Sequence, residues 1–275
     1  MKRGLRFSVR TLLLLMTAAA IGLGVFVARV ERQRRAMQAV LAAGGHVAYD
    51  FEYNSGGKSI TSKAPAWLLQ GAGHDYFHQV WVVHLNWPDC DGSGLSQAEI
   101  HRLLKDLPHL RRLRLGGADN ETLALVGRMK GLKQLDLYCA SAVTDEGIAR
   151  LEPLEKLESL QLCDSRITNE GVASIAKHKA LTRILLESAP QVTDNAVASL
   201  ARNTSLEHLT ITGSRIGDRG AVAVALTASR SFQSLKLDGS RMTAEGKWAV
   251  IDSRFPPEIR QQIRDARERS RQPIE

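Results

Sequence analysis

The sequence repeats a short leucine-rich phrase at nearly constant intervals, and this periodicity restricts the possible folds more than any other feature. The pattern L-x-x-L-x-L, with a large apolar residue at each marked position, starts at Leu110, Leu132, Leu157, Leu181, Leu206 and Phe232. The intervals are 22, 25, 24, 25 and 26 residues, and a first copy starts at Val80, 30 residues before Leu110. A period of roughly 20–50 residues indicates one structural unit that is stacked many times.

Within one copy, the hydrophobic spacing changes from that of a strand to that of a helix. Leu160 and Leu162 alternate with Ser159 and Gln161, as the two faces of a half-buried strand require. After a turn comes a polar pair such as Thr168-Asn169, whose hydroxyl can cap the free N–H groups at the start of a helix. Apolar residues at helical spacing follow. Each copy is therefore predicted to be a strand, a turn and a short helix.

A single unit of this kind cannot enclose its own leucines. A fully buried Leu or Ile side chain contributes about 1.5–3 kcal/mol to stability, but here only when neighbouring copies cover it. The copies must therefore stack. The predicted fold class is α/β, a solenoid of about seven repeats with a parallel sheet on its concave face and helices on its convex face.

The fuller phrase, L-x-x-L-x-L followed by I-T-[DN]-x-G-[IV]-A-x-[LI], resembles the leucine-rich repeat in its ribonuclease-inhibitor-like variant. The resemblance covers residues 80–256. The order of RFSVRTLLLLMT, a basic helix, GGHVAYDFEY and the repeats is similar to a group of uncharacterised bacterial membrane-anchored leucine-rich-repeat proteins. The second copy departs from the pattern because it lacks the ITDxG motif. The resemblance implies a module that recognises another protein through its concave sheet.

The net charge of +8 could indicate a nucleic-acid-binding protein, but the charge is unevenly distributed. Residues 1–35 hold eight Lys or Arg and one Glu, whereas the remainder carries 29 basic and 28 acidic side chains. The excess of positive charge therefore belongs to the N-terminus and predicts no basic groove on the repeats. We expect no nucleic-acid partner.

Residues 11–28, TLLLLMTAAAIGLGVFVA, carry no charge and are long enough for a helix to cross the hydrocarbon core of a bilayer. We interpret them as an uncleaved single-pass transmembrane helix. A cleaved signal peptide is the alternative, because Ala18-Ala19-Ala20 offers small residues for cleavage. Four basic residues flank each side of the run, so the positive-inside rule gives little guidance. The favoured orientation places the repeats outside the cytoplasm.

The expected organisation follows from these features. It comprises a basic N-terminal tail (1–10), a transmembrane anchor (11–28), a juxtamembrane helix (29–43), an N-terminal cap over the first repeat (44–79), the leucine-rich repeats (80–256) and a charged C-terminal tail (257–275).

The outward-facing strand residues of successive copies form parallel rows on the concave sheet, and these rows are the expected partner-binding surface. The candidate partner-binding residues are Arg112, Arg114, Gln134, Asp136, Tyr138, Gln161, Arg183, Glu187, His208, Lys236 and Asp238. Arg and Tyr are frequent among residues that dominate interface energies. The plainer interpretation is a solvated strand face, on which Arg114 and Asp136 simply pair with each other. A purely structural spacer is therefore the alternative function.

No catalytic motif stands out, and we expect neither an enzyme nor a cofactor. Regular rows spread polar side chains at intervals instead of converging them on a pocket. The stretch DCDGSGLSQAE (residues 89–99) is similar to a calcium-binding loop, but its acidic residues are out of step and no helix precedes it. A calcium-dependent or hydrolytic module is therefore a less favoured alternative, and we expect no metal site.

Three cysteines, Cys90, Cys139 and Cys163, are too few for a disulfide framework. Cys139 and Cys163 follow the strands of adjacent copies. Two interpretations remain open for them: small, half-buried side chains at turns, or a disulfide that joins the two.

Overall fold

The computed structural model describes residues 8–52, 74–76, 78–85, 95–200, 202–220, 234–241 and 243 of the 275-residue chain. The expected C-terminal tail and residues 89–94 of the calcium-like loop lie outside these residues, as does much of the expected N-terminal cap.

Seven parallel strands run in chain order through one sheet, and an antiparallel strand is added at its N-terminal edge. The antiparallel strand is β1 (His46–Tyr49). The parallel strands are β2 (Val80–His84), β3 (Arg112–Gly116), β4 (Gln134–Tyr138), β5 (Ser159–Cys163), β6 (Arg183–Glu187), β7 (His208–Gly217) and β8 (Ser234–Arg241). The predicted fold class, a leucine-rich-repeat solenoid, is confirmed.

The register of the sheet places the equivalent leucines of successive repeats side by side. Leu135 pairs with Leu160, Leu160 with Ile184, and Ile184 with Leu209. All four side chains are buried, and they belong to one continuous apolar core that runs the length of the stack. The strand face directed inward is therefore the one that the alternation of apolar residues predicts.

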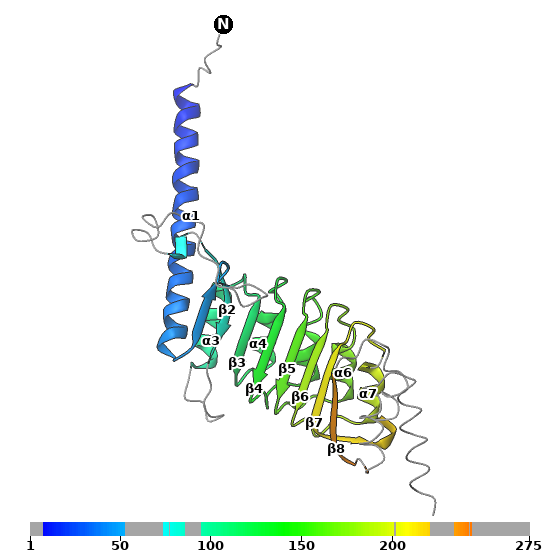
Figure 1. Ribbon diagram of the computed structural model, residues 1–275. Helices are drawn as coiled ribbons and strands as arrows, with labels where there is room; N and C mark the ends of the chain where they lie inside the picture. The colour runs from blue at the N-terminus through cyan, green and yellow to red at the C-terminus, as the bar shows by residue number, and fades with distance from the viewer. Residues whose placement is uncertain are drawn as a thin grey trace, which may run out of the picture.

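Short helices cover one side of the sheet and leave the other side open (Figure 1). They are α3 (Gln97–Asp106), α4 (Asn120–Val126), α5 (Asp145–Ala149), α6 (Asn169–Ile175) and α7 (Asp194–Leu200). Each presents two or three buried residues to the core. α3 begins with a capping box, in which Ser96 and Glu99 each accept a backbone N–H of the other.

A polar clamp joins each repeat to the next, and we use this name for the hydrogen bonds from the first turn of one helix to the turn of the following repeat. Asp145 Oδ1 accepts the backbone N–H of Thr168 at 2.8 Å, and Asp145 Oδ2 accepts its hydroxyl at 2.6 Å. The same clamp joins Asn120 to Thr144, Asn169 to Thr193, Asp194 to Gly217 and Asp218 to Thr243.

Capping a helix is not the only role of the threonines after each turn, because the clamp also involves them. Thr168 does cap its own helix, since its hydroxyl accepts Glu170 N–H at 3.2 Å. The Thr144 hydroxyl makes no such bond, because it accepts a bond from Asn120 of the preceding repeat instead. The expectation that these hydroxyls cap their own helices is therefore correct for Thr168 and wrong for Thr144.

The glycine of the T-[DN]-x-G motif leaves room for the clamp of the preceding repeat. A Cβ atom on Gly171 would lie 2.2 Å from Asp145 Oδ1, and one on Gly147 would lie 2.3 Å from Asn120 Oδ1. Both distances are too short for unbonded atoms. The motif thus connects two repeats. Its Asn or Asp side chain bonds to the following repeat, and its glycine leaves space for the Asn or Asp side chain of the preceding repeat.

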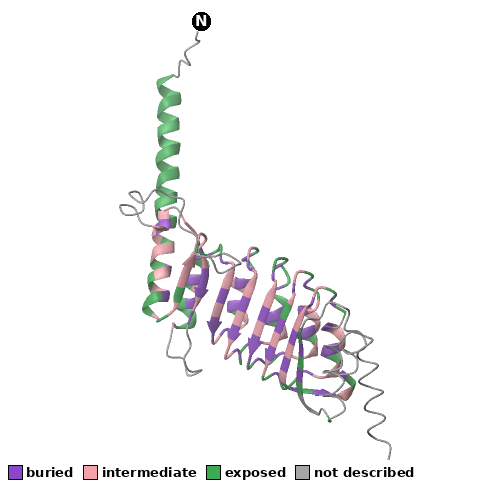
Figure 2. Cartoon of the chain, viewed as in Figure 1, coloured by how far each residue is buried: buried purple, intermediate pink, exposed green. Residues whose placement is uncertain are grey.

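One continuous helix, α1 (Val9–Ala42), contains both the expected transmembrane anchor and the expected juxtamembrane helix. Residues 8–29 are exposed, and Val30 is the first buried residue (Figure 2). From there Val30, Ala36 and Val40 are buried, and the last two join the core of the repeats. This half of α1, together with β1, closes the end of the solenoid. The exposed half is long and apolar enough to cross a bilayer.

The clamp predicts a graded response to substitution at Asp145. Asp145→Ala removes both acceptors of Thr168, and we expect it to lower the free energy of unfolding by about 1–3 kcal/mol. Asp145→Asn should cost much less, because Asn120 and Asn169 make the equivalent clamp with an amide. Urea unfolding of the full chain in detergent, followed by circular dichroism, measures the difference. An unchanged free energy of unfolding for Asp145→Ala would show that the clamp contributes nothing, and equal losses for the two variants would show that an amide cannot replace the carboxylate at this position.

Candidate functional site

The expected partner-binding residues occupy the open face of the sheet, in rows fixed by the strand register. In the first row, Arg112, Gln134, Ser159, Arg183, His208 and Ser234 lie side by side. In the second row lie His84, Arg114, Asp136, Gln161, Leu185, Thr210 and Lys236. Tyr138, Glu187 and Asp238 lie further along their strands. The placement of these residues in rows agrees with the sequence analysis, whereas their role in binding is a proposal.

Three of these side chains form a compact cluster on β3 and β4. Arg114 Nη2 donates a hydrogen bond to the Tyr138 hydroxyl at 3.0 Å, and the guanidinium carbon lies 5.1 Å from the centre of the Tyr138 ring. Arg114 Nε also lies 3.6 Å from Asp136 Oδ2. The Asp136 side chain is only 17% exposed, against 41% for Arg114. Arg114 is therefore held in place on the face by two neighbours and still accessible to a partner.

Burial raises the pKa of Asp136 against the opposing attraction of Arg114, Arg112 and Arg183. Burial likewise raises the pKa of Tyr138. Because the Asp136 side chain is only 17% exposed, this part of the concave face is poorly hydrated, although its side chains are polar. Electrostatic interactions are stronger in such surroundings than on a fully solvated surface.

Two further side chains extend the cluster to the neighbouring strands. Arg112 Nε donates a hydrogen bond to Gln134 Oε1. His84 lies beside Arg114 in the sheet, and its buried Nε2 atom has no hydrogen-bond partner in the described part of the chain. Burial and the positive charges of Arg114 and Arg112 lower the pKa of His84 to about 4, so the ring is neutral near pH 7. His84 was not among the expected binding residues, although its position in the second row could have indicated it.

The candidates on β5 to β8 are not connected in the same way. Cys163 Sγ donates a hydrogen bond to Glu187 Oε2 at 3.3 Å, and Gln161 Nε2 donates to Cys163 Sγ at 3.7 Å. No ion pair within the described residues includes Arg183, His208, Lys236 or Asp238. The half of the concave face nearest α1 therefore carries the polar network around Arg114, whereas on β5 and β6 the described side-chain hydrogen bonds are those that join Gln161, Cys163 and Glu187.

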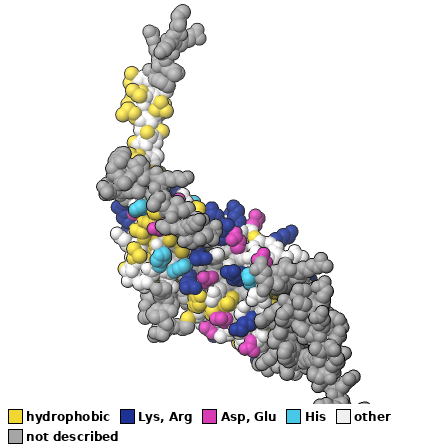
Figure 3. All heavy atoms as spheres, in the orientation of Figure 1, with side chains coloured by type: hydrophobic (Ala, Val, Ile, Leu, Met, Phe, Trp, Pro, Cys, Tyr) yellow, Lys and Arg dark blue, Asp and Glu magenta, His cyan; other side chains and the backbone are white. Residues whose placement is uncertain are grey.

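Figure 3 shows basic and acidic side chains interspersed on the face of the molecule in view. Among the described residues, no group of three or more His, Cys, Asp or Glu side chains could hold a metal ion. The calcium-like loop is mostly outside these residues, so the structure does not bear on that alternative.

Cys163 and Cys139 do not pair with each other. Cys163 is a free thiol, whereas Cys139 is disulfide-bonded. The possible disulfide between them is therefore ruled out, and only Cys163 retains the expected role of a small buried side chain. Burial raises the pKa of Cys163 to about 11, and the nearby Glu187 adds to the shift.

Comparison with known proteins places the fold among leucine-rich repeats. The family described as Leucine Rich repeat matches residues 202–225. The structure of a complex of Rad7 and Elc1 from yeast is similar, with a TM-score of 0.51 and 15% identity over 88% of this chain and 69% of that one. A pollen receptor kinase 3 (TM-score 0.37, 17% identity, 60% of this chain and 76% of that one) shows a weaker likeness. No curated protein matches the chain in sequence.

The position of His84 predicts a pH dependence of stability. Its folded pKa of about 4 lies below the ordinary value of 6.5. The unfolded chain therefore takes up this proton at a higher pH than the folded chain does. The titration of His84 therefore has no effect on stability above about pH 6.5, and it lowers the free energy of unfolding as the pH drops toward 4. We expect His84→Gln to reduce the fall in the urea midpoint between about pH 7 and pH 5.

The matched control for this measurement is His208→Gln, which changes a histidine on the same face of the sheet. We expect this variant to show the same fall in the urea midpoint between about pH 7 and pH 5 as the original chain. If His84→Gln also keeps the whole decline, the neutral state assigned to His84 is incorrect.

The two described cysteines predict different labelling behaviour. In the folded chain Cys163 should react slowly with an alkylating reagent, because it is only 6% exposed and its thiol is protonated near pH 7. Denaturation should expose it, and Cys163→Ser should abolish that labelling. Cys139 should react only after reduction. Mass spectrometry of the alkylated peptides checks both, and labelling of Cys139 without a reductant would contradict its bonded state.

Proposed function

Because the chain folds as a leucine-rich-repeat solenoid, we propose that it is a membrane-anchored, non-catalytic recognition module that binds another protein through its concave sheet. The observation that carries this proposal is the network of Arg112, Arg114, Asp136 and Tyr138 on the open face. Repeats of this kind present an extended concave surface that suits protein partners.

The geometry of the network suits binding. Tyr and Arg supply much of the energy at protein interfaces. Arg114 is already held by the Tyr138 hydroxyl and the Asp136 carboxylate, so a partner need not immobilise a freely moving side chain. The surrounding face is polar and of mixed charge, which favours a protein partner with complementary charges over a nucleic acid.

The exposed half of α1 supports the membrane anchor. Most of its large apolar side chains, among them Leu12, Leu14 and Leu23, are more than half exposed. An apolar surface of this length would be unfavourable in water, whereas it matches the core of a bilayer. The anchor would then leave the whole solenoid on one side of the membrane.

The bonded state of Cys139 supports a location outside the cytoplasm. Disulfides persist in oxidising compartments and are rare where thiols are kept reduced. The flanking charges of α1 do not decide the orientation, so this bond is the observation that favours exported repeats.

The regular rows of the sheet support a non-catalytic role. Neighbouring strands are about 4.8 Å apart, so equivalent side chains lie along a line and do not converge on one enclosed centre. The polar groups of Arg112, Gln134, Ser159 and Arg183 are an example of such a row.

Proximity labelling from the anchored chain tests the proposal. We expect Arg112→Ala, Arg114→Ala and Tyr138→Ala in combination to remove one or more labelled proteins, because the substitutions delete the centre of the network. The matched control changes Arg128, Lys130 and Lys156 to Ala, which are exposed basic residues outside the rows.

Two outcomes would contradict the proposal. An identical set of labelled proteins for the original chain and the concave-face variant would exclude this face as the binding surface. No specifically labelled protein for any form would favour the alternative, a structural spacer.

A further inference from the structure

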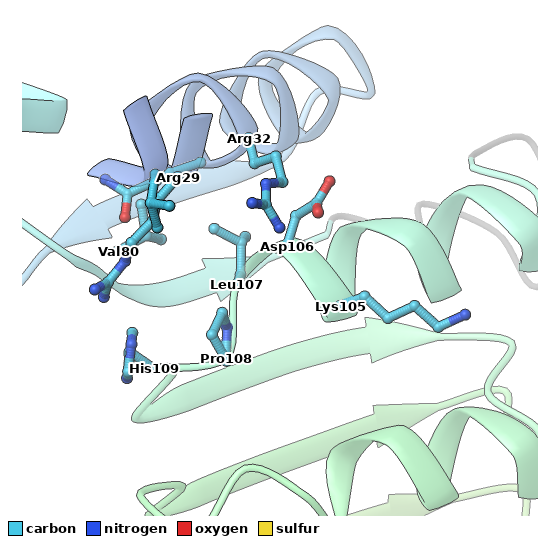
Figure 4. Close-up of a pocket in the computed structure, with 10 residues that line it drawn as sticks. Arg29, Arg32, Val80, Lys105, Asp106, Leu107, Pro108 and His109 are labelled. Carbon is cyan, nitrogen blue, oxygen red and sulfur yellow. The ribbon is translucent and has the colours of Figure 1, made fainter. Parts of the chain in front are cut away.

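A pocket of about 330 Å³ lies where α1 meets the first repeat, between α1, the end of α3 and the turn that leads to β3 (Figure 4). Its lining combines one apolar residue of the exposed half of α1 with basic and acidic side chains of both helices and the turn. They include Val25, Arg29, Arg32, Lys105, Asp106 and His109. Neither the repeat pattern nor the apolar run alone indicates this pocket, because its walls are 80 residues apart in the sequence.

The charges that line the pocket are unbalanced. Arg29, Arg32 and Lys105 are exposed, and none of them forms an ion pair within the described residues. Among the described residues that line the pocket, Asp106 is the one acidic residue. Burial lowers the pKa of His109, and the positive charges of Arg29 and Arg111 lower it further. The neutral histidine leaves an excess of two positive charges.

Neighbouring acids do not neutralise this excess. Asp75 lies near Arg29 in an adjacent pocket, but it accepts bonds from Arg34 Nε at 3.2 Å and from the Tyr49 hydroxyl at 2.8 Å. On the other side, the lining of a second pocket of about 440 Å³ adds Arg35 and Arg102 and one further acid, Glu99. Glu99 is engaged in the capping box of α3. The basic character therefore continues along the groove between α1 and α3.

The position of the pocket along α1 suggests its ligand. Val25 belongs to the uncharged run, and Arg29 is the first charged residue after it, one helical turn away. Val30, the next residue, is the first that the solenoid buries. If residues 11–28 span the bilayer, the pocket opens at the level of the lipid headgroups, with its apolar end toward the hydrocarbon and its basic end toward water.

We propose that this pocket binds the phosphate of an anionic phospholipid, with Arg29 and Arg32 against the phosphate and Val25 against the start of an acyl chain. The proposal rests on the membrane anchoring proposed above. Lysine and arginine side chains at a membrane surface favour anionic lipids, and arginine matches the geometry of phosphate oxygens. A lipid is the ligand argued for here, because a free phosphate would make no use of Val25 or of the bilayer.

Native mass spectrometry of the full chain in nanodiscs tests the proposal. The nanodiscs contain phosphatidylcholine with a minor fraction of phosphatidylglycerol, and the retained phosphatidylglycerol per chain is measured. The combined variant Arg29→Gln, Arg32→Gln and Lys105→Gln should lower this retention by about tenfold or more. Asp106→Asn should raise it, because it removes the one acidic group of the lining.

A charge-matched control changes Arg128, Lys130 and Lys156 to Gln and should leave retention unchanged. Equal retention in the control and the pocket variant would overturn the proposal. So would displacement of the lipid by inorganic phosphate, which would identify a free anion as the ligand. Alkaline extraction of each variant from membranes is measured in parallel. A chain that is extracted lacks the proposed anchor, and the lipid site falls with it; a chain that resists extraction but shows no preference for phosphatidylglycerol lacks the lipid site alone.

Discussion

Each repeat of this protein can bury its leucines only against its neighbours, and the rest of the structure depends on that constraint. Leu160 is buried because Leu135 flanks it on one side and Ile184 on the other. The non-directional packing of such side chains would tolerate small displacements. The polar clamps add the directional part, since each fixes the turn of one repeat to the helix start of the preceding one. Apolar packing thus stabilises the stack, and the clamps fix the position of each repeat relative to the next.

The sheet and its rows could be predicted from sequence because they follow from two strict periods. Alternation within a strand decides which residues face outward, and the repeat length decides which residues become neighbours. The sequence alone therefore places Arg114 and Asp136 side by side. The clamp made by Asp145, in contrast, could not be predicted from the repeat pattern. A local pattern does not reveal that its carboxylate binds the following repeat, since capping and clamping use the same residue types.

Features that depend on contacts between unlike segments could not be predicted in this way. The neutral state of His84 results from burial and two arginines on the adjacent strand, and none of these follows from the residue itself. The pocket beside α1 is lined by both Arg29 and Lys105, and the repeat pattern does not relate these two residues to each other. The same holds for Cys139, whose bonded state is not evident from cysteine spacing. The periodic structure could be predicted from the sequence, whereas contacts between segments that the repeat does not relate could not.

The continuous course of α1 has a mechanical consequence. Because one helix passes from the exposed apolar half into the core of the solenoid without an intervening loop, the two halves should turn together as a lever. If α1 spans a bilayer as proposed, a change in bilayer thickness would change the tilt of the apolar half, and the far strands would move further than the near ones. The distance between the concave face and the lipid surface would then vary along the sheet.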